Sequence, residues 1–324
     1  MKIAVLGTGA YGLAIAHSLA KNKHSIVMWT ENENKYSEWL NTKNLASIIP
    51  DYNMPENIEV NNDIEYVVKD AKAIFITCAS RYVYSVANQI KNLYNKTIPI
   101  CIASKGIEEI TCRFMSDVVK DVLHSSSICV ISGPTFAIDI LHNEPVALAI
   151  ASTNFKARSF ITKLLSSDTL KLRKSNDLIG VQICGSVKNI IAIASGILAG
   201  LGYSESTQAF LINESLHDIK ELIGYLGGKK KTILSYAGVG DLLMTSMSKK
   251  SRNYSFGLVC ATGDSKQIND FLDTHTVEGY FTLKIVIKLI KSKKINIPII
   301  YLINNIVEGK KDPHELANFL INKK

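Results

Sequence analysis

The sequence of 324 residues predicts an α/β domain with a mainly parallel sheet, followed by an all-α domain. Short apolar runs alternate with helix-length segments in the first half, as in strands buried on both faces of a parallel sheet. A glycine-rich turn directly follows the first run. After residue 175 no further convincing strand can be found. We therefore expect two domains, 1–175 and 176–324, which the chain length also favours.

The first strand and the turn after it carry the most specific pattern. Residues 2–6, KIAVL, are followed at once by GTGAYG, in which Gly7, Gly9 and Gly12 form a GxGxxG motif. An apolar helical face follows, and a second strand is expected at 25–29. This order is typical of Rossmann-type domains, where the glycines let the backbone approach a pyrophosphate at a helix N-terminus. The pattern predicts a dinucleotide-binding domain.

Glu31 follows the second strand, close to the position where such domains place an acid about 20 residues beyond the glycines. That acid bridges the adenosine ribose hydroxyls, and its carboxylate repels a 2′-phosphate. Glu31 therefore favours NAD over NADP. A solvated loop glutamate is the alternative, because Glu33 lies close by.

The rest of the first domain is expected to complete the sheet. Residues 30–68 are polar with weak helical periodicity and contain Pro50 and Pro55, which indicates an excursion before the sheet resumes. Further strands are expected at 73–78, 98–103, 128–132 and 146–151, a helix at 155–165, and an edge strand at 169–173. Ligands bind at the carboxyl ends of parallel strands. Lys105 follows one such end and precedes Gly106, so it is a candidate site residue, although an exposed loop lysine fits the pattern equally well.

The second domain opens with an unusual helix between Asn176, a good N-cap, and Gly200 or Gly202. It is apolar or small on nearly every face, which predicts a helix buried all round. Lys188 and Asn189 interrupt it. A buried ammonium needs a partner or a wet pocket, unless its stem snorkels to solvent. The apolar run at 190–201 is shorter than the ~20 residues that a bilayer requires, so no integral membrane segment is expected.

Further along the chain, Asp241 lies in a glycine-flanked turn that fits a helix N-cap. Thr245 and residues 249–253, KKSRN, follow as a cluster of donors suited to a phosphate dianion. An exposed loop is the alternative for this cluster. Its nearness to Asp241 and the presence of Lys188 favour a binding site.

Composition limits the possible partners. The net charge of +8 favours acidic ligands, but aromatic residues are not interleaved with the basic ones, so we expect a phosphorylated small molecule and no nucleic acid. The six cysteines form no CxxC pair and lie mostly in apolar runs. They are expected to be reduced and buried, and not to bind a metal. With no N-terminal signal visible, a cytoplasmic protein is expected.

Several ordered blocks of the sequence carry a resemblance that spans the chain nearly end to end. They are GTGAYGLAIA at 7–16, SKG at 104–106, SGPTFA at 132–137, GSVKNIIAIASG at 185–196, GVGDLLMT at 238–245, SRN at 251–253 and VEG at 277–279. With these blocks the chain resembles the NAD(P)-dependent glycerol-3-phosphate dehydrogenases of bacterial type.

The resemblance implies reversible reduction of dihydroxyacetone phosphate to sn-glycerol 3-phosphate, which would supply phospholipid synthesis, by a homodimer. It implies that Lys188 is the proton donor and acceptor and that Lys105, Asp241 and Asn189 complete or support the reacting centre. By the same resemblance the substrate contacts also include Gly133, Thr135, Ser251, Arg252 and Asn253. The dinucleotide contacts include Ala10, Tyr11, Lys105, Ala137, Arg252 and Glu278, besides the glycines and Glu31.

The chain departs from the family pattern in three places. Glu31 stands where the family commonly has arginine, which strengthens the expectation of NAD. Ala79 replaces a proline before Ser80, and residues 203–206 and the pair Asn213-Glu214 differ from the family's helical domain. The departures in the helical domain keep one alternative open, a dinucleotide-binding regulator with impaired catalysis. A related hydroxy-acid dehydrogenase is the other alternative, although such relatives usually place lysine and asparagine a helical turn apart, whereas Lys188 and Asn189 are adjacent.

Overall fold

The computed structural model describes residues 1–323, which form an α/β unit and a helical unit, as the sequence predicts. The first compact unit contains residues 1–105 and 113–178. The second contains residues 106–112 and the chain from Ile179 onward. The proposed domain limits, 1–175 and 176–324, stay a prediction.

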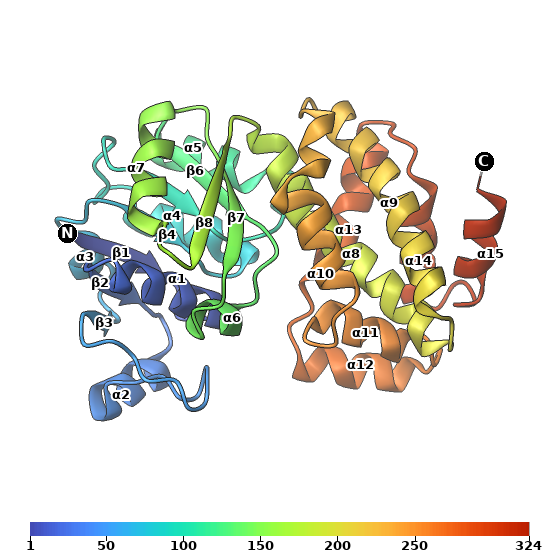
Figure 1. The fold of residues 1–324 in the computed structure, drawn as a ribbon, viewed down its shortest axis with the longest axis horizontal. Coiled ribbons are helices and arrows are strands. Elements are labelled where there is room, and N and C mark those ends of the chain that lie inside the picture. The colour runs from blue at the N-terminus through green and yellow to red at the C-terminus, as the bar shows by residue number, and fades with distance from the viewer. Residues whose placement is uncertain (324) are drawn as a thin grey trace. The chain divides into compact units, whose positions relative to one another are not determined.

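The first unit is built on one eight-stranded sheet with the order β3-β2-β1-β4-β5-β6-β7-β8 (Figure 1). Neighbouring strands are parallel except β6 and β7, which are antiparallel. The strands are β1 Lys2–Leu6, β2 Ser25–Trp29, β3 Ile58–Asn61, β4 Ile74–Ile76, β5 Ile100–Ile102, β6 Ile128–Ser132, β7 Val146–Ala151 and β8 Leu170–Ser175.

The sequence prediction was wrong for β3, which lies inside the segment expected to be an excursion from the sheet. In this edge strand Ile58 and Val60 are buried, whereas Glu59 and Asn61 are only partly covered. Only four residues alternate in this way, and among polar neighbours so short a pattern does not predict a strand. Strands β4 and β5 are also shorter than the apolar runs that predicted them, because only the buried centres of those runs pair in the sheet. Residues 77–78 and 98–99, at the ends of the runs, lie in loops and are partly buried.

Helices cover both faces of the sheet, which is why its strands are apolar on both sides. On one face α1 packs against α6 and α7, and on the other α4 packs against α3 and α5 (Figure 1). The helices of this unit are α1 Ala10–Lys21, α2 Glu33–Thr42, α3 Ile64–Val68, α4 Val83–Ile90, α5 Met115–Leu123, α6 Ala137–Leu141 and α7 Phe155–Leu165, with a short 3₁₀ turn, η1, at Ser80–Tyr82.

The second unit is built around α8, Leu178–Gly200, a 23-residue helix. It begins two residues after Asn176, so Asp177 and not Asn176 precedes its first residue. Because α8 extends well beyond the apolar run at 190–201, the length argument against a membrane helix was wrong. By length and composition alone α8 could cross a membrane, but 89% of its most apolar window is buried within the protein. Burial therefore marks it as a core helix.

The other helices of this unit follow α8 in the chain, and no strand occurs among the residues described beyond Ser175. They are α9 Glu205–Tyr225, α10 Asp241–Ser246, α11 Arg252–Cys260, α12 Ser265–Thr274, α13 Glu278–Ser292, α14 Pro298–Val307 and α15 Glu315–Asn322. Two short turns, η2 Lys230–Leu234 and η3 Tyr236–Gly240, lead from α9 into α10.

Glycines let α11 approach α8 closely. A Cβ added to Gly196 of α8 would lie 2.1 Å from the carbonyl oxygen of Tyr254, and one added to Gly257 of α11 would lie 2.1 Å from that of Ile193. Both distances are far below van der Waals contact. The helix that carries Lys188 and the helix that begins at Arg252 are therefore held backbone to backbone.

Candidate functional site

A cavity of about 500 Å³ opens in the first unit where the order of the strands reverses, between β1 and β4. Ligands of open α/β sheets bind at such a switch point, outside the carboxyl ends of the strands. The turns after β1, β2 and β4 supply most of the wall. The lining residues are Gly7, Thr8, Gly9, Trp29, Thr30, Glu31, Asn32, Lys35, Thr77, Cys78, Ala79, Tyr82 and Val86.

The three motif glycines have different tasks in this wall. Gly7 has a φ of +128°, which favours glycine, and a Cβ on Gly12 would lie 2.3 Å from the Gly7 carbonyl oxygen. These two glycines make the turn and let α1 pack on it. A Cβ on Gly9 would meet nothing within 4 Å. The space over Gly9, at the N-terminus of α1, therefore fits a phosphate group.

Two charged side chains line this cavity, Glu31 and Lys35. Glu31 is exposed and lies two residues after the end of β2. The Lys35 ammonium donates a 3.5 Å hydrogen bond to the carbonyl oxygen of Thr8, and burial lowers the pKa of this lysine. The sequence analysis missed Lys35, although its place in the first turn after Glu31 is a usable signal.

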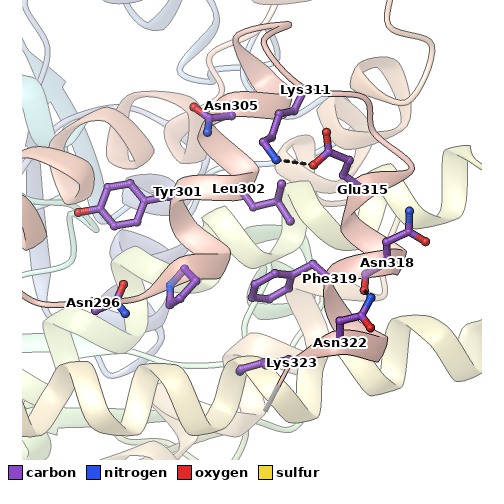
Figure 2. Close-up of a pocket in the computed structure, with 11 residues that line it drawn as sticks. Asn296, Tyr301, Leu302, Asn305, Lys311, Glu315, Asn318, Phe319, Asn322 and Lys323 are labelled. Carbon is purple, nitrogen blue, oxygen red and sulfur yellow. Dashed lines mark hydrogen bonds and ion pairs between the residues drawn. The ribbon is translucent and has the colours of Figure 1, made fainter.

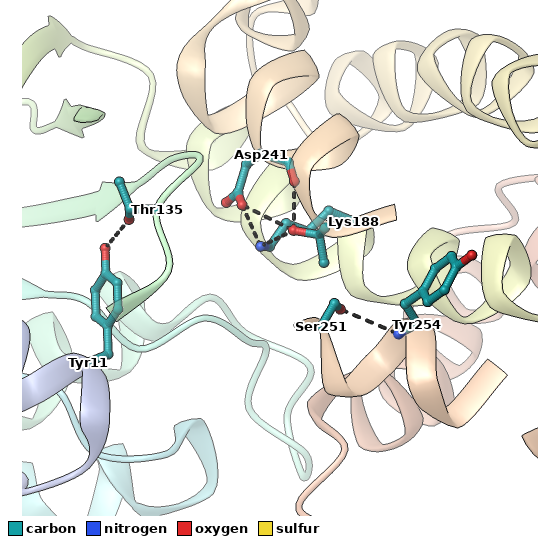
Figure 3. Close-up of polar contacts among 7 residues, drawn as sticks. Tyr11, Thr135, Lys188, Asp241, Ser251 and Tyr254 are labelled. Atoms are coloured by element: carbon teal, nitrogen blue, oxygen red, sulfur yellow. Dashed lines mark hydrogen bonds and ion pairs between the residues drawn. The ribbon is translucent and has the colours of Figure 1, made fainter. Parts of the chain in front are cut away.

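Other predicted residues of the first unit gather around Tyr11, in the first turn of α1. The Tyr11 hydroxyl and the Thr135 hydroxyl share a 3.0 Å hydrogen bond (Figure 3), and the Lys105 ammonium lies 5.9 Å from the centre of the Tyr11 ring. Gly133 packs so tightly that a Cβ there would lie 2.9 Å from the Ala147 carbonyl oxygen. Residues from three separate sequence blocks are thus brought together. Ala10 and Ala137 are the first residues of α1 and α6.

Lys188 lies in the second unit and is 5% exposed. Its ammonium donates to Asp241 Oδ1 at 2.5 Å and to the Thr245 hydroxyl at 2.7 Å (Figure 3). Asp241 is fully buried. The Thr245 hydroxyl in turn donates to the backbone carbonyl oxygen of Asp241 at 2.7 Å. The ammonium therefore has partners and does not snorkel to solvent. A buried charge of this kind is tolerated when it is paired and hydrogen-bonded.

Thr245 was wrongly grouped with the phosphate donors in the sequence analysis. It lies one helical turn after Asp241 on α10, so both side chains project from the same face of that helix. Its 3% exposure and its hydrogen bond to Lys188 make it part of the buried centre. The spacing of four residues between Asp241 and Thr245 could have indicated in the sequence that the two side chains lie together.

Ser251, Arg252 and Asn253 form the start of α11. The Ser251 hydroxyl caps the helix by accepting from the Tyr254 amide at 3.3 Å, and the exposed Arg252 is the first helical residue. Asn253 Oδ1 accepts from the Gly279 amide at 2.8 Å, beside Glu278 at the start of α13. Asn253 thus uses its oxygen structurally and keeps its amide nitrogen for donation. A helix N-terminus next to a guanidinium suits a phosphate.

Another cavity of the second unit, about 570 Å³, lies along α14 and α15 (Figure 2). Its lining residues are Asn296, Pro298, Tyr301, Leu302, Asn305, Lys311, Glu315, Asn318, Phe319, Asn322 and Lys323. The Lys311 ammonium is paired with the Glu315 carboxylate. None of the site residues predicted from the sequence lines this cavity.

Comparison with known proteins decides the family. The model of the NAD-dependent glycerol-3-phosphate dehydrogenase N-terminus matches residues 2–158, and the model of its C-terminus matches residues 177–318. The chain belongs to this family. The predicted resemblance is thereby confirmed, and the protein is an oxidoreductase that uses a nicotinamide dinucleotide.

Individual relatives agree over their full length. A glycerol-3-phosphate dehydrogenase [NAD(P)+] of Vesicomyosocius okutanii is 34% identical, over 99% of this chain and 97% of the relative. One from Leuconostoc citreum is 31% identical with the same coverage. The crystal structure of the glycerol-3-phosphate dehydrogenase of Coxiella burnetii is similar with a TM-score of 0.94, at 30% identity and 99% coverage of both chains.

Two of the departures from the family pattern, Glu31 and Ala79, line the cavity of the first unit. The third, at residues 203–206 and 213–214, lies mostly on the surface of the second unit. Ser204, Glu205, Ser206 and Asn213 are exposed. Glu214 is half-buried, and its carboxylate lies 3.2 Å from the ammonium of Lys323, which also contacts Asp218 at 2.9 Å. These contacts tie the end of α15 to α9. Asn189, the neighbour of Lys188 in α8, is 3% exposed.

The cysteine prediction needs one correction. All six cysteines are free, but Cys78 and Cys112 are only partly buried, because each lies in a loop beyond a strand and not within it. Among the residues that the structure describes, no group of three or more histidine, cysteine or acidic side chains could hold a metal ion.

Substitutions at Gly9 and Gly12 should separate an effect on dinucleotide binding from an effect on folding. Gly9→Ala should fold normally and bind NADH at least about tenfold more weakly, since the new methyl group fills the space over the turn. Gly12→Ala should instead lower the free energy of unfolding by about 1–3 kcal/mol, because its Cβ overlaps the Gly7 carbonyl. Urea unfolding and NADH titration of both variants distinguish the two effects. Normal NADH affinity in folded Gly9→Ala would contradict this assignment.

Proposed function

We propose that this protein catalyses the reversible NAD-dependent reduction of dihydroxyacetone phosphate to sn-glycerol 3-phosphate. The observation that carries this proposal is the buried Lys188 ammonium, held by Asp241 and Thr245 in a chain of the glycerol-3-phosphate dehydrogenase family. Such a lysine has the chemistry of a positioned proton donor.

In the proposed reaction Lys188 moves the proton. A bound nicotinamide dinucleotide supplies the hydride that reduces the ketone carbon. As negative charge develops on the ketone oxygen, Lys188 Nζ donates a proton to it, and it takes the proton back in the reverse direction. Asp241 and Thr245 orient the ammonium through its two hydrogen bonds. Asn189 is proposed to support this centre from the adjacent position.

The substrate phosphate is proposed to bind at the start of α11. Arg252 would supply a planar pair of donors, Asn253 its amide nitrogen, and Ser251 stands at the cap of the helix. Lys105, Gly133 and Thr135 are proposed as further substrate contacts. Binding a remote phosphate is an effective way to hold a small ketone in a reactive position.

NAD is the proposed cofactor, with NADP disfavoured by Glu31. The open space over Gly9 and the compact turn at Gly7 and Gly12 fit the pyrophosphate. Glu31 lines the same cavity beyond β2, where its carboxylate can accept from the ribose hydroxyls. The remaining proposed contacts are Ala10, Tyr11, Lys105, Ala137, Arg252 and Glu278.

The proposal extends to the cellular role. sn-Glycerol 3-phosphate is the backbone of phospholipids, so the reaction would supply phospholipid synthesis. A cytoplasmic location and a homodimer are proposed with it. The six free cysteines support a reducing compartment.

Substrate choice tests the proposed reaction directly. Absorbance decay of NADH should be rapid with dihydroxyacetone phosphate and negligible with unphosphorylated dihydroxyacetone, because the phosphate supplies the binding energy that positions the ketone. A charge-reversed Arg252→Glu variant should lose activity mainly through a higher KM. Equal turnover of both ketones by the unaltered protein would refute the phosphate site.

Lys188 should be essential for turnover but not for the dinucleotide. Lys188→Met should lower kcat by about 10²- to 10⁴-fold, while NADH titration gives an affinity close to that of the unaltered protein. Because the single change removes the cation that faces the buried Asp241 carboxylate, it should also destabilise the fold by about 3–5 kcal/mol. The Lys188→Met/Asp241→Asn double variant removes both charges and separates lost chemistry from lost stability. A stable double variant with normal kcat would exclude Lys188 as the proton donor.

Glu31 should determine discrimination against the 2′-phosphate. Glu31→Arg is expected to raise kcat/KM for NADPH relative to NADH by at least about tenfold, through removal of repulsion and gain of a cation. Glu33→Arg is the matched control, since Glu33 is two residues away and does not line the cavity. An unchanged cofactor ratio in Glu31→Arg, or the same change in the control, would contradict the prediction.

A further inference from the structure

Lys35 lies in the cofactor cavity together with Glu31, with the opposite charge. Both side chains line the wall that is formed by the end of β2 and the start of α2, together with Trp29, Thr30 and Asn32. A carboxylate alone would make this end of the cavity repel a 2′-phosphate. The nearby ammonium changes that electrostatic balance.

The position of Lys35 is fixed by the start of α2. The side chain of Asn32 caps this helix by accepting from the Lys35 amide at 3.0 Å. From there the Lys35 side chain reaches back to the turn after β1, where Nζ donates to the Thr8 carbonyl oxygen at 3.5 Å. Thr8 is itself tied to Thr30 by a 2.9 Å hydrogen bond between their hydroxyls. The ammonium thus lies where the two turns of the cavity meet.

This is an unfavourable place for a cation in the absence of a ligand. Positive charges are destabilising in the first turn of a helix, where the dipole favours anions. Burial further disfavours the charged form of Lys35 and thereby lowers its pKa. Residues that break a local rule of stability are expected at functional sites. An anionic ligand in the cavity would relieve both effects.

We propose that Lys35 is a second determinant of cofactor choice, whose ammonium binds the adenosine ribose end of the dinucleotide and attracts a 2′-phosphate. It opposes Glu31, so the protein discriminates against NADP less than the carboxylate alone would dictate. This inference rests on the proposed function, since it assigns a residue to the same dinucleotide site.

The test is calorimetric titration with NADH and NADPH, which needs no turnover. NADPH binding is measured in a Glu31→Gln background, where its affinity is high enough to follow. In that background Lys35→Met should raise the Kd for NADPH at least about tenfold more than the Kd for NADH. Lys35→Arg, which keeps the charge, should leave the ratio of the two Kd values close to that of its parent.

Lys43 provides the matched control. It stands at the other end of the same helix, with its ammonium 4.1 Å from the centre of the Trp39 ring, and it does not line the cavity. Lys43→Met removes the same charge from α2 and should leave both affinities unchanged. Thermal unfolding of each variant confirms that the fold is intact.

The outcomes separate this inference from the function on which it rests. If Lys35→Met weakens NADH and NADPH by the same factor, or if Lys43→Met shifts the ratio equally, Lys35 does not read the 2′-phosphate and the inference is overturned. The proposed reaction would stand in that case. If the unaltered protein binds neither dinucleotide, the proposed function and the inference both fail.

Discussion

The buried pair of Lys188 and Asp241 is the interaction on which the second unit depends. Both side chains are removed from water, so each charge is stabilised by the opposite charge beside it. Helix α8 supplies the lysine, and α10, which begins at Asp241, supplies both the carboxylate and Thr245. Close glycine contacts hold α11 against α8 as well. The same packing that satisfies the charge therefore also positions the start of α11, where the phosphate is proposed to bind.

The cavity of the first unit arises from a different constraint, the reversal of strand order between β1 and β4. The reversal leaves a cavity that no crossover helix fills, and the turn after β1 forms its floor. Gly7 and Gly12 are needed for the backbone itself, whereas Gly9 leaves room for a ligand. Glu31 and Lys35 reach the same cavity from the next turn and the next helix. Folding and the proposed cofactor recognition thus depend on neighbouring residues with separate tasks.

Prediction of helices and strands from the sequence succeeded where the hydrophobic pattern was long or came from residues adjacent in the chain. The apolar runs of β1, β2, β6 and β7 and the 155–165 helix agree with the structure because each is strongly periodic or continuous. It failed for β3, whose four residues alternate only weakly, and for the start of α8, where Asn176 and Asp177 are equally good caps. The expected extent of α8, from Asn176 to Gly200 or Gly202, agrees closely with Leu178–Gly200, but the membrane argument counted only the apolar run after Lys188 and Asn189.

The sequence by itself determined the two-part architecture, the glycine turn and the family, because these depend on residues that are adjacent or regularly spaced. Only the tertiary structure decided which donors face which charge. The Thr245 hydroxyl accepts a hydrogen bond from Lys188, and Asn253 Oδ1 accepts one from the backbone amide at the start of α13. The Lys35 ammonium donates to the carbonyl oxygen of Thr8. Each of these contacts joins segments that are distant in the chain. Their geometry is set by how helices and strands pack, which no local pattern encodes.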